Sequence, residues 1–292
     1  MMRIRSLPFL AFVATTPLAR SADAPGPIAP VLQSFVDKHI APGVVALVAS
    51  KDGVLTLEKA GYASLANKTA IGEDALFWIA SMSKSLTGTA LMMLVDEGRI
   101  SLDDPVEKYL PEFKGQMVAG PEGTDTPHPP KHPITVREIM SHTSGLVLAS
   151  EKTLRRTRVL KDDVAVYAAR PLRQEPGTKY EYNNCGINTG GRIIEVVSGM
   201  SYADFMQRRL FDPLGMKDTT CWPDEEQAAR LAHTARFTED KTDLIEILLD
   251  ANATPEAILK FSGGVPVPRA ALATAERAAQ RGGLIQRTAS RW

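Results

Sequence analysis

The chain has 292 residues, and 34 Lys and Arg balance 34 Asp and Glu, so its formal net charge is zero. Apolar residues make up 44 % of the chain and charged residues 23 %, which is typical of folded globular proteins and excludes a disordered chain. The neutral balance argues against a nucleic-acid partner, because nucleic-acid binders normally carry a basic excess. Two cysteines are too few for a disulfide-rich scaffold or a four-thiolate metal site.

The first 24 residues show the order of features that is typical of a secretory signal peptide. Two arginines are followed by a mostly apolar run over 7–18 and then by small residues. This run is shorter than the ~20 apolar residues that span a bilayer, and no later stretch is apolar enough to do so. We therefore predict a signal peptide over 1–24 and an exported protein, periplasmic or extracellular, that does not span the membrane. A disordered N-terminal tail is the alternative, because prolines interrupt the apolar run.

The body of the chain opens with β-rich runs and continues with helices. Residues 43–49 and 54–60 are β-rich and flank an Asp-Gly pair, which is the pattern of a hairpin. Apolar residues recur close to helical spacing in further segments, which are 31–40, 80–97, 135–141, 188–197 and 202–210. We expect Gly145 to cap the helix over 135–141. Because strands precede helices without a regular βαβ alternation, the sequence predicts an α+β fold.

Ser81 and Lys84 form a Ser-x-x-Lys pair in the predicted helix over 80–97. Residues three apart on a helix share a face, so the lysine amine can lie beside the serine hydroxyl. A lysine whose pKa is lowered by burial can take the serine proton and make the hydroxyl a nucleophile. Chance alone places about 0.8 such pairs in a chain with 16 serines and 14 lysines. By itself the pair therefore favours the alternative, a surface helix with an exposed lysine.

Tyr182 and Asn184 form a Tyr-x-Asn, which chance would place only about 0.1 times in a chain of this composition. A neighbouring lysine ammonium favours the phenolate, so Tyr182 could act as general base toward Ser81 and as acid toward a leaving group. Asn184 could orient a substrate amide or hold Lys84. The alternative is a turn-forming Asn pair that precedes the helix over 188–197.

In this order and 101 residues apart, the two motifs resemble those of the serine β-lactamase and penicillin-binding-protein superfamily. The resemblance is strongest to class C β-lactamase-like and family VIII esterase-like members. Five ordered stretches are similar to segments of that family, namely 77–84, 102–111, 134–146, 176–178 and 211–216. The resemblance covers roughly residues 28–235 and implies a β-lactamase/DD-peptidase-like fold, in which an antiparallel sheet is flanked by helices and carries an inserted all-helical subdomain.

In that family the serine attacks a carbonyl, forms an acyl-enzyme, and water or another acceptor releases the acyl group. The resemblance therefore implies that Ser81 is the nucleophile, Lys84 its activating partner and Tyr182 the general base and acid, with Asn184 supporting substrate binding. The main-chain N–H of Ser81 would supply half of an oxyanion hole. The implied substrate is a small-molecule ester, amide or β-lactam, with a peptidoglycan peptide among the candidates. No metal or organic cofactor is implied, since these side chains suffice for acyl transfer.

Two further residue types have less definite roles. His142 lies in a family-like segment but outside the catalytic motifs, and we interpret it as a structural residue. An oxidising compartment would allow Cys185 to pair with Cys221, although two free thiols are the default expectation.

The third motif of the family has no match in this chain. That motif is a Lys-Thr-Gly, His-x-Gly or Trp-x-Gly on a late strand, whereas 241–243 lacks the glycine and 260–264 departs from the pattern. Family chains also continue beyond the point where this one ends. We therefore expect an incomplete β-lactamase-related domain over 28–268 without the late strands of the sheet, followed by an atypical Arg- and Ala-rich tail over 269–292. The interpretation is a truncated or frame-shifted chain, and a divergent member that uses an Arg-rich helix is the alternative.

Three classes of function stay open on these grounds. The first is a serine hydrolase that forms an acyl-enzyme, and the retained motifs favour it. The second is a catalytically impaired pseudoenzyme or binding relative, and the third is a fragment that does not fold. The missing third motif favours these two. A cooperative thermal transition would exclude the unfolded fragment.

Overall fold

The computed structural model describes four stretches of the chain, which are 26–119, 126–147, 160–221 and 223–247. The expected signal peptide over 1–24, the stretch 260–264 and the tail over 269–292 lie outside the described residues.

The β-rich N-terminal runs form the predicted hairpin. Strands β1 (Gly43–Ser50) and β2 (Gly53–Ser64) pair antiparallel across a tight turn. Gly53 closes this turn with φ 146°, an angle that residues with a Cβ rarely adopt. The short strand β3 (Thr69–Ala70) pairs with β2, so the sheet has the order β1-β2-β3.

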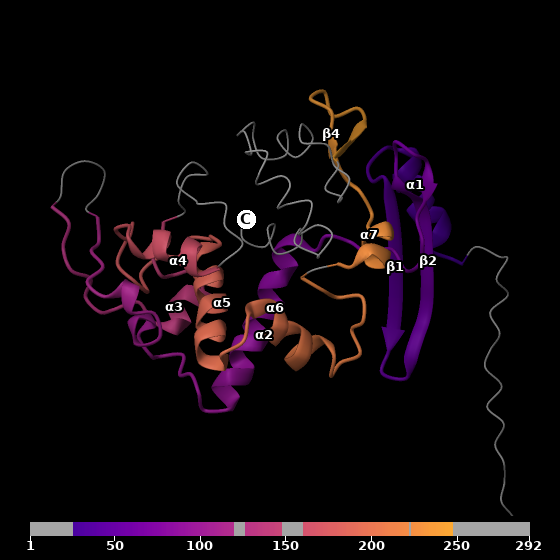
Figure 1. Ribbon diagram of the computed structural model, residues 1–292. Coiled ribbons are helices and arrows are strands. Elements are labelled where there is room, and N and C mark those ends of the chain that lie inside the picture. The colour runs from indigo at the N-terminus through magenta and orange to yellow at the C-terminus, as the bar shows by residue number, and fades with distance from the viewer. Residues whose placement is uncertain (1–25, 120–125, 148–159, 222, 248–292) are drawn as a thin grey trace, which may run out of the picture.

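Helix α1 (Ala29–Asp37) packs beside this hairpin, as Figure 1 shows. The carboxylate of Glu58, a buried residue of β2, accepts hydrogen bonds from the main-chain N–H groups of Ile28 and Ala29. A carboxylate at a helix N-terminus satisfies unpaired N–H groups and opposes the helix dipole. The helix ends earlier than the predicted residue 40, and His39 takes φ 55° just after it.

The helical part is organised around α5 (Cys185–Ser198), which packs against its neighbours on several sides. These neighbours are α2 (Ser83–Asp96), α3 (Val136–Met140), α4 (Leu160–Ala168) and α6 (Tyr202–Phe205). Their buried apolar side chains form the core, among them Leu91, Leu94, Ile139, Tyr167, Ile193 and Phe205. Shorter helical turns complete this part, namely Ala80–Met82, Val106–Lys108, Pro111–Phe113 and the π-helical Met206–Phe211 that continues α6.

A glycine brings α3 and α5 into close contact. A Cβ on Gly186, in the first turn of α5, would lie 2.1 Å from the main-chain oxygen of Ile139 in α3. Non-bonded carbon atoms approach no nearer than about 3.5 Å, so only glycine fits there. The absent side chain thus sets the distance between the end of α3 and the start of α5.

The N-terminus of α3 carries a complete capping box, in which Thr135 and Glu138 bind each other's main-chain N–H groups. At the other end the predicted cap was wrong. The C-cap is Ser141, and His142 follows it with φ 60°. Gly145 also has a positive φ, but a Cβ there would lie 2.4 Å from the main-chain oxygen of Gln174, so its role is close packing.

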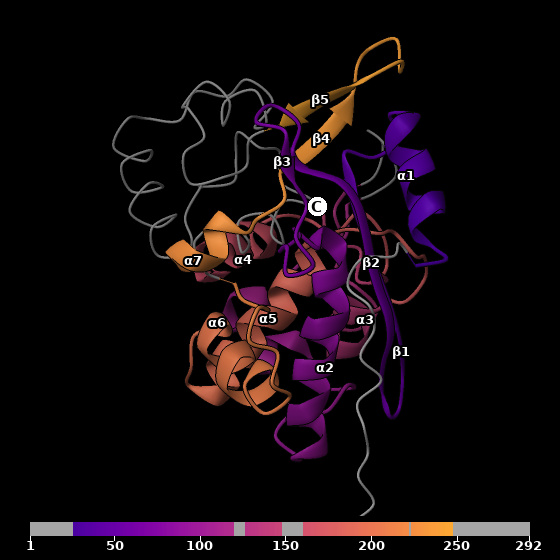
Figure 2. The ribbon, with the colours of Figure 1, turned by 90° about the vertical axis from the view of Figure 1, so that its right-hand side faces the viewer.

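The C-terminal described residues form α7 (Glu225–Ala229) and a second antiparallel hairpin, β4 (Thr234–Phe237) and β5 (Leu244–Ile247). Glu246 of β5 accepts hydrogen bonds from the Ser64 hydroxyl and from the Ala66 N–H, which ties this hairpin to the end of β2. Figure 2 shows β4 and β5 beside β3 at that end.

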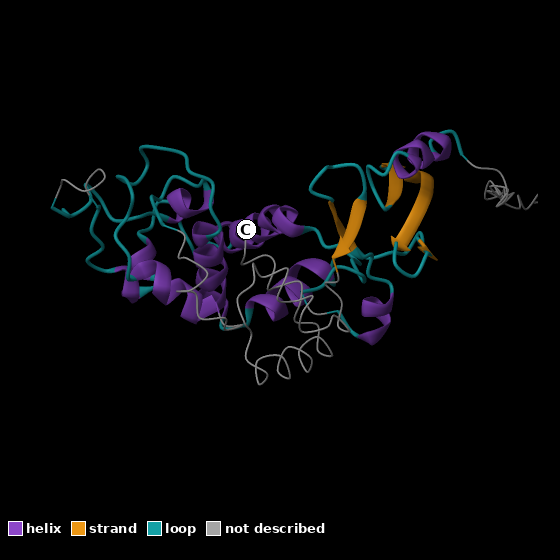
Figure 3. Ribbon diagram, turned by 90° about the horizontal axis from the view of Figure 1, so that it is seen from above, coloured by secondary structure: helices purple, strands orange, loops and turns teal. Residues whose placement is uncertain are grey.

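The predicted α+β class with antiparallel strands is confirmed. The helices α2 to α7 lie between β3 and β4 in the chain, and Figure 3 shows the strands gathered on one side and most helices on the other. No helix within the described ranges has both the length and the apolar character needed to cross a membrane.

Candidate active site

Ser81 lies in the turn Ala80–Met82, which leads directly into α2, and Lys84 lies in the first turn of that helix. The predicted helix over 80–97 is therefore present but begins with a tighter, 3-10 turn. Ala80 takes φ 44°, a left-handed conformation that costs a residue with a Cβ about 1–2 kcal/mol. Backbone strain of this kind concentrates at functional sites.

The hydroxyl oxygen of Ser81 accepts two side-chain hydrogen bonds. Lys84 Nζ donates one over 3.0 Å, and the Tyr182 hydroxyl donates the other over 2.7 Å. Lys84 Nζ also lies 4.9 Å from the centroid of the Tyr182 ring, within the range of a cation–π contact. Ser81 and Lys84 are half-buried and Tyr182 is 49 % exposed. The structure thus brings together three of the four residues that the motifs indicated, at a place that solvent reaches.

The same contacts change the acidity of the phenol. The Lys84 ammonium, and after it the hydrogen bond with Ser81, hold the pKa of Tyr182 below its ordinary value. A neighbouring cation favours the phenolate, which is the charged form. Because half of the side chain is exposed, solvent screens part of this effect. These contacts therefore make the deprotonated form of Tyr182 more accessible than that of an ordinary tyrosine.

Asn184 is not joined to this cluster by a hydrogen bond. It is the N-cap of α5, its side chain is fully buried, and its amide nitrogen and oxygen have no hydrogen-bond partner among the described residues. A buried amide without partners costs about 1–3 kcal/mol. The position of Asn184 two residues after Tyr182 keeps it near the cluster, but its predicted contact with substrate or Lys84 stays a prediction.

His142 also contacts this cluster, although the sequence analysis interpreted it as a structural residue. Its ring centroid lies 4.7 Å from that of Tyr182 and 5.8 Å from that of Tyr180. Its Nδ1 accepts a hydrogen bond from the main-chain N–H of Asn183 over 3.4 Å. No sequence spacing indicates this contact, because it depends on the close packing of α3 against α5 at Gly186.

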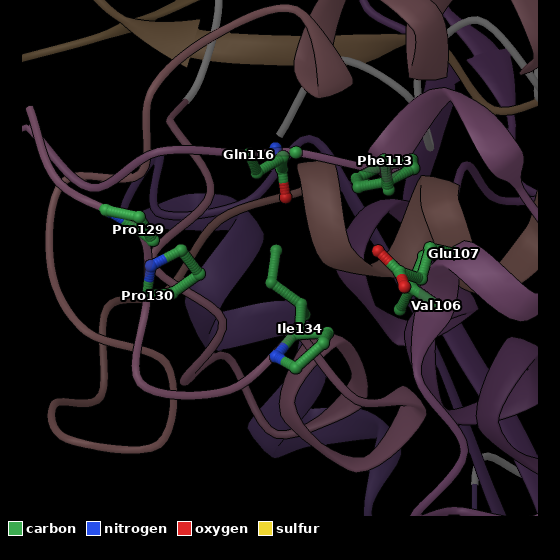
Figure 4. Close-up of a pocket in the computed structure, with 9 residues that line it drawn as sticks. Val106, Glu107, Phe113, Gln116, Pro129, Pro130 and Ile134 are labelled. Carbon is green, nitrogen blue, oxygen red and sulfur yellow. The ribbon is translucent and has the colours of Figure 1, made fainter.

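The described cavity of about 200 Å³ lies elsewhere, among the loops of the helical part, as Figure 4 shows. Its walls are mostly apolar and consist of Val106, Glu107, Phe113, Gly115, Gln116, Pro129, Pro130, Pro133 and Ile134. None of the residues of the Ser81 cluster lines it. The Ser81 cluster lies beside Met82, which is 65 % exposed, and Tyr180, which is 62 % exposed.

Two other sequence-based points concern residues away from the cluster. The tripeptide 241–243 forms the turn between β4 and β5, and Lys241 there has φ 59°. It does not lie on a strand, in agreement with the failed match to the third family motif. Cys185 and Cys221 are not joined by a disulfide.

Comparison with known proteins supplies the family. A family model described as Beta-lactamase matches residues 28–291. Penicillin-binding protein 4* of Bacillus subtilis is 29 % identical over 212 residues, which cover 70 % of this chain and 43 % of that protein. The chain spans 37 % to 61 % of the length of curated relatives that match it.

Solved structures show the same fold. EstCE1, described as a hydrolase with promiscuous acyltransferase activity, is similar with a TM-score of 0.64 and 22 % identity over 87 % of this chain and 67 % of that one. D-amino acid amidase from Ochrobactrum anthropi is similar with a TM-score of 0.57 and 29 % identity over 73 % of this chain and 56 % of that one.

Proposed function

The chain belongs to the beta-lactamase family, and from that premise we propose that it is a serine hydrolase that forms an acyl-enzyme on Ser81. One observation carries this proposal: the Ser81 hydroxyl lies within hydrogen-bond distance of both Lys84 Nζ and the Tyr182 hydroxyl. A serine becomes a useful nucleophile when a neighbouring base takes its proton. The substrates are small-molecule esters, amides or β-lactams. The names of two relatives, a penicillin-binding protein and a D-amino acid amidase, support the β-lactam and the amide.

The proton of the Ser81 hydroxyl is transferred along the hydrogen bond between Tyr182 and Ser81. In the ionised form, the Tyr182 oxygen accepts the Ser81 proton while Ser81 Oγ bonds to the substrate carbonyl carbon. Tyr182 then gives this proton to the leaving oxygen or nitrogen as its bond to the carbonyl carbon breaks, which leaves the acyl group on Ser81. In the second half, Tyr182 takes a proton from water as the water oxygen attacks the acyl carbon. The bond between this carbon and Ser81 Oγ then breaks, the carboxylic acid leaves, and Tyr182 returns the proton to Ser81 Oγ.

Lys84 supports both halves as a fixed cation. Its ammonium donates to Ser81 Oγ and lies against the Tyr182 ring, so it stabilises the negative charge that either oxygen carries. Asn184 has a substrate-binding role in this proposal. Its buried, unpartnered amide gains a hydrogen bond when a substrate amide or Lys84 reaches it, and this gain offsets the cost of burying it.

Hydrolysis of a short-chain p-nitrophenyl ester tests the proposal, with purified wild type beside Ser81→Ala. The matched control is Ser85→Ala, an exposed serine one turn further along α2. We expect Ser81→Ala to lower kcat at least about 10³-fold and Ser85→Ala to behave as wild type. Equal rates in wild type and Ser81→Ala would overturn the assignment of Ser81 as nucleophile.

A binding or catalytically impaired relative is the second candidate, and the turn at 241–243 favours it. A missing oxyanion donor lowers kcat by about 10²–10³-fold, so acylation without rapid release is its signature. A fluorescent penicillin distinguishes the two. Labelling that needs Ser81 but is not followed by turnover assigns the chain to this second class, whereas turnover assigns it to the first.

Export is the remaining part of the proposal. The charged, apolar and small residues over 1–24 support a signal peptide. Mass spectrometry of the mature protein from a secreting host tests it. A new N-terminus near residue 25 is expected, and an intact Met1 in the cell fraction would contradict export.

A further inference from the structure

His142 is joined to the segment that carries Tyr182 at three points. Its main-chain oxygen accepts a hydrogen bond from the N–H of Glu181 over 2.8 Å, and its Nδ1 accepts one from the N–H of Asn183 over 3.4 Å. Between these two bonds the imidazole packs against the Tyr182 ring, with the ring planes tilted by 46°. The residues on both sides of Tyr182 are thus bound to a single residue, and the phenol itself rests on its side chain.

The bond to Asn183 specifies the protonation state of the imidazole. A ring nitrogen that accepts a hydrogen bond carries no proton, so Nδ1 is bare and the neutral ring carries its proton on Nε2. Protonation at Nδ1 removes the acceptor and breaks the bond to Asn183. The neutral ring is therefore the form that holds the segment.

The charges around the ring act in the same direction. Burial, and after it the Lys84 ammonium, lower the pKa of His142. The titratable groups that face the ring are Lys84 of α2 and the phenols of Tyr180 and Tyr182. The Glu181 carboxylate on the same segment is paired with Arg173. Within the described part of the chain, a protonated imidazole would therefore face a second cation without a carboxylate to balance it.

We propose that His142 is a positioning residue for the reaction at Ser81: in its neutral form it holds Tyr182 within hydrogen-bond distance of the nucleophile, and its protonation releases Tyr182. This inference rests on the proposed function. The backbone conformation of His142 supports the proposal as well. His142 has a left-handed φ of 60°, and such a position after a helix is usually occupied by glycine or asparagine. The imidazole thus occupies a strained position from which it reaches Tyr182.

Two substitutions separate positioning from simple packing. His142→Asn keeps the left-handed backbone and places an amide oxygen close to the position of Nδ1, but it does not titrate. His142→Leu removes the acceptor. We expect His142→Leu to lower kcat about 10- to 100-fold, as expected for a displaced general base, with KM changed by less than about threefold because substrate contacts are untouched. His142→Asn should restore most of kcat.

The pH profile gives the sharper test, since a packing role would not alter it. Below the His142 pKa, which lies under the ordinary 6.5, two protonations inactivate the wild type, one on Tyr182 and one on His142. Its kcat/KM should fall about 100-fold per pH unit below the His142 pKa, whereas that of His142→Asn should fall about 10-fold. Identical slopes in the two proteins would overturn the proposal, as would wild-type kcat in His142→Leu. If His142→Leu does not fold, the slopes decide.

The phenol itself reports on His142 even without turnover. Difference spectra at alkaline pH between each protein and its Tyr182→Phe counterpart follow the ionisation of this one tyrosine. The pKa of Tyr182 should rise toward its ordinary value in His142→Leu and stay lowered in His142→Asn. If the wild type shows no Ser81-dependent hydrolysis, the proposed function fails, but this titration still tests the positioning by His142. An unchanged Tyr182 pKa in His142→Leu would overturn it.

Discussion

At the scale of single residues, the candidate site depends on one hydroxyl oxygen that accepts hydrogen bonds from two side chains. Ser81 Oγ accepts from Lys84 and from Tyr182, and the two donors are also in contact with each other. Removing either donor changes the charge and the position of the remaining one. The effects of single substitutions in this cluster are therefore not additive.

Lys84→Met tests the role of the cation. Without the ammonium, Ser81 loses a donor and the phenolate of Tyr182 loses its nearest positive charge, so kcat should fall about 10²–10⁴-fold. The pKa of Tyr182 should also move up toward its ordinary value, because the ammonium is the largest cause of its lowering. Steady-state kinetics and alkaline difference spectra measure both. Lys114→Met, at an exposed lysine, is the control, and a wild-type rate in Lys84→Met would contradict this role.

The acidity of Tyr182 also predicts the pH dependence of the reaction. In the proposed mechanism the general base is the phenolate, so kcat/KM should rise with pH and level off above the pKa of Tyr182. Because this pKa lies below the ordinary 10.0, the plateau should begin below pH 10.0. A pH–rate profile from pH 6 upward measures it, and Tyr182→Phe should lose the rising limb. A rate that is flat over this range would contradict a tyrosine base.

The sequence predicted the local part of this cluster better than the distant part. Ser81 and Lys84 are one helical turn apart, so their spacing alone predicted a shared face. Tyr182 required the resemblance to a family, because 101 residues separate it from Ser81. The contact of His142 with Tyr182 was not predicted, since it is created by the packing of two helices and leaves no periodic signal.

At the scale of elements, the distance between α3 and α5 positions the site. The turn after α3 carries His142, and the residues just before α5 carry Tyr182. These helices approach closely because Gly186 has no side chain against the Ile139 oxygen. The distance between α3 and α5 thus affects the positions of the residues in the candidate site.

Gly186→Ala should push the two helices apart. Its Cβ would lie 2.1 Å from main-chain oxygen, and overpacking of this kind destabilises a protein by about 1–3 kcal/mol. Thermal unfolding should show a lower Tm, and kcat should fall with it. The control is Gly88→Ala in α2, where the nearest atom to the new Cβ is 4.0 Å away and alanine stabilises a helix by about 0.5–1 kcal/mol. An unchanged Tm in Gly186→Ala would contradict the close packing.

Elements with a clear turn or periodic signal were predicted, among them the short α3, whereas α4, α7, β3, β4 and β5 were not. The hairpin from β1 to β2 and the helices around 80–97 and 188–197 carry strong turn or periodic signals. The strands β4 and β5 have only four residues each, which is too few for a pattern to stand out. The cap of α3 was misplaced because His142, and not a glycine, takes the left-handed position after the helix.

At the scale of the whole molecule, the two β-hairpins are held together by Glu246. Its carboxylate accepts hydrogen bonds from Ser64 and from the N–H of Ala66, and it is paired with His233. Burial raises the pKa of Glu246, but the bond from Ala66 and then the contact with His233 outweigh it, so the pKa lies below its ordinary value. The charged carboxylate therefore stabilises the folded protein.

The lowered pKa of Glu246 predicts how the stability of the protein depends on pH. A carboxyl group whose pKa is lowered by folding contributes stability above its unfolded pKa, near 4.5, and loses it as the pH falls through the folded value. Glu246→Gln should lower the stability by about 1–3 kcal/mol at pH 7 and should flatten the loss of Tm below pH 4.5. Glu239→Gln, an exposed neighbour in the same hairpin, is the control. Equal Tm values for wild type and Glu246→Gln from pH 3 to 7 would contradict the account.

The trapped acyl-enzyme tests the central claim most directly. Intact mass spectrometry of the protein after incubation with a slowly released β-lactam or activated ester shows whether one acyl group is added, and peptide mapping shows where. We predict a single addition on the peptide that contains Ser81, present in wild type and Ser85→Ala and absent in Ser81→Ala. An addition on another residue, or one that persists in Ser81→Ala, would contradict the assignment of Ser81 as the acylated nucleophile.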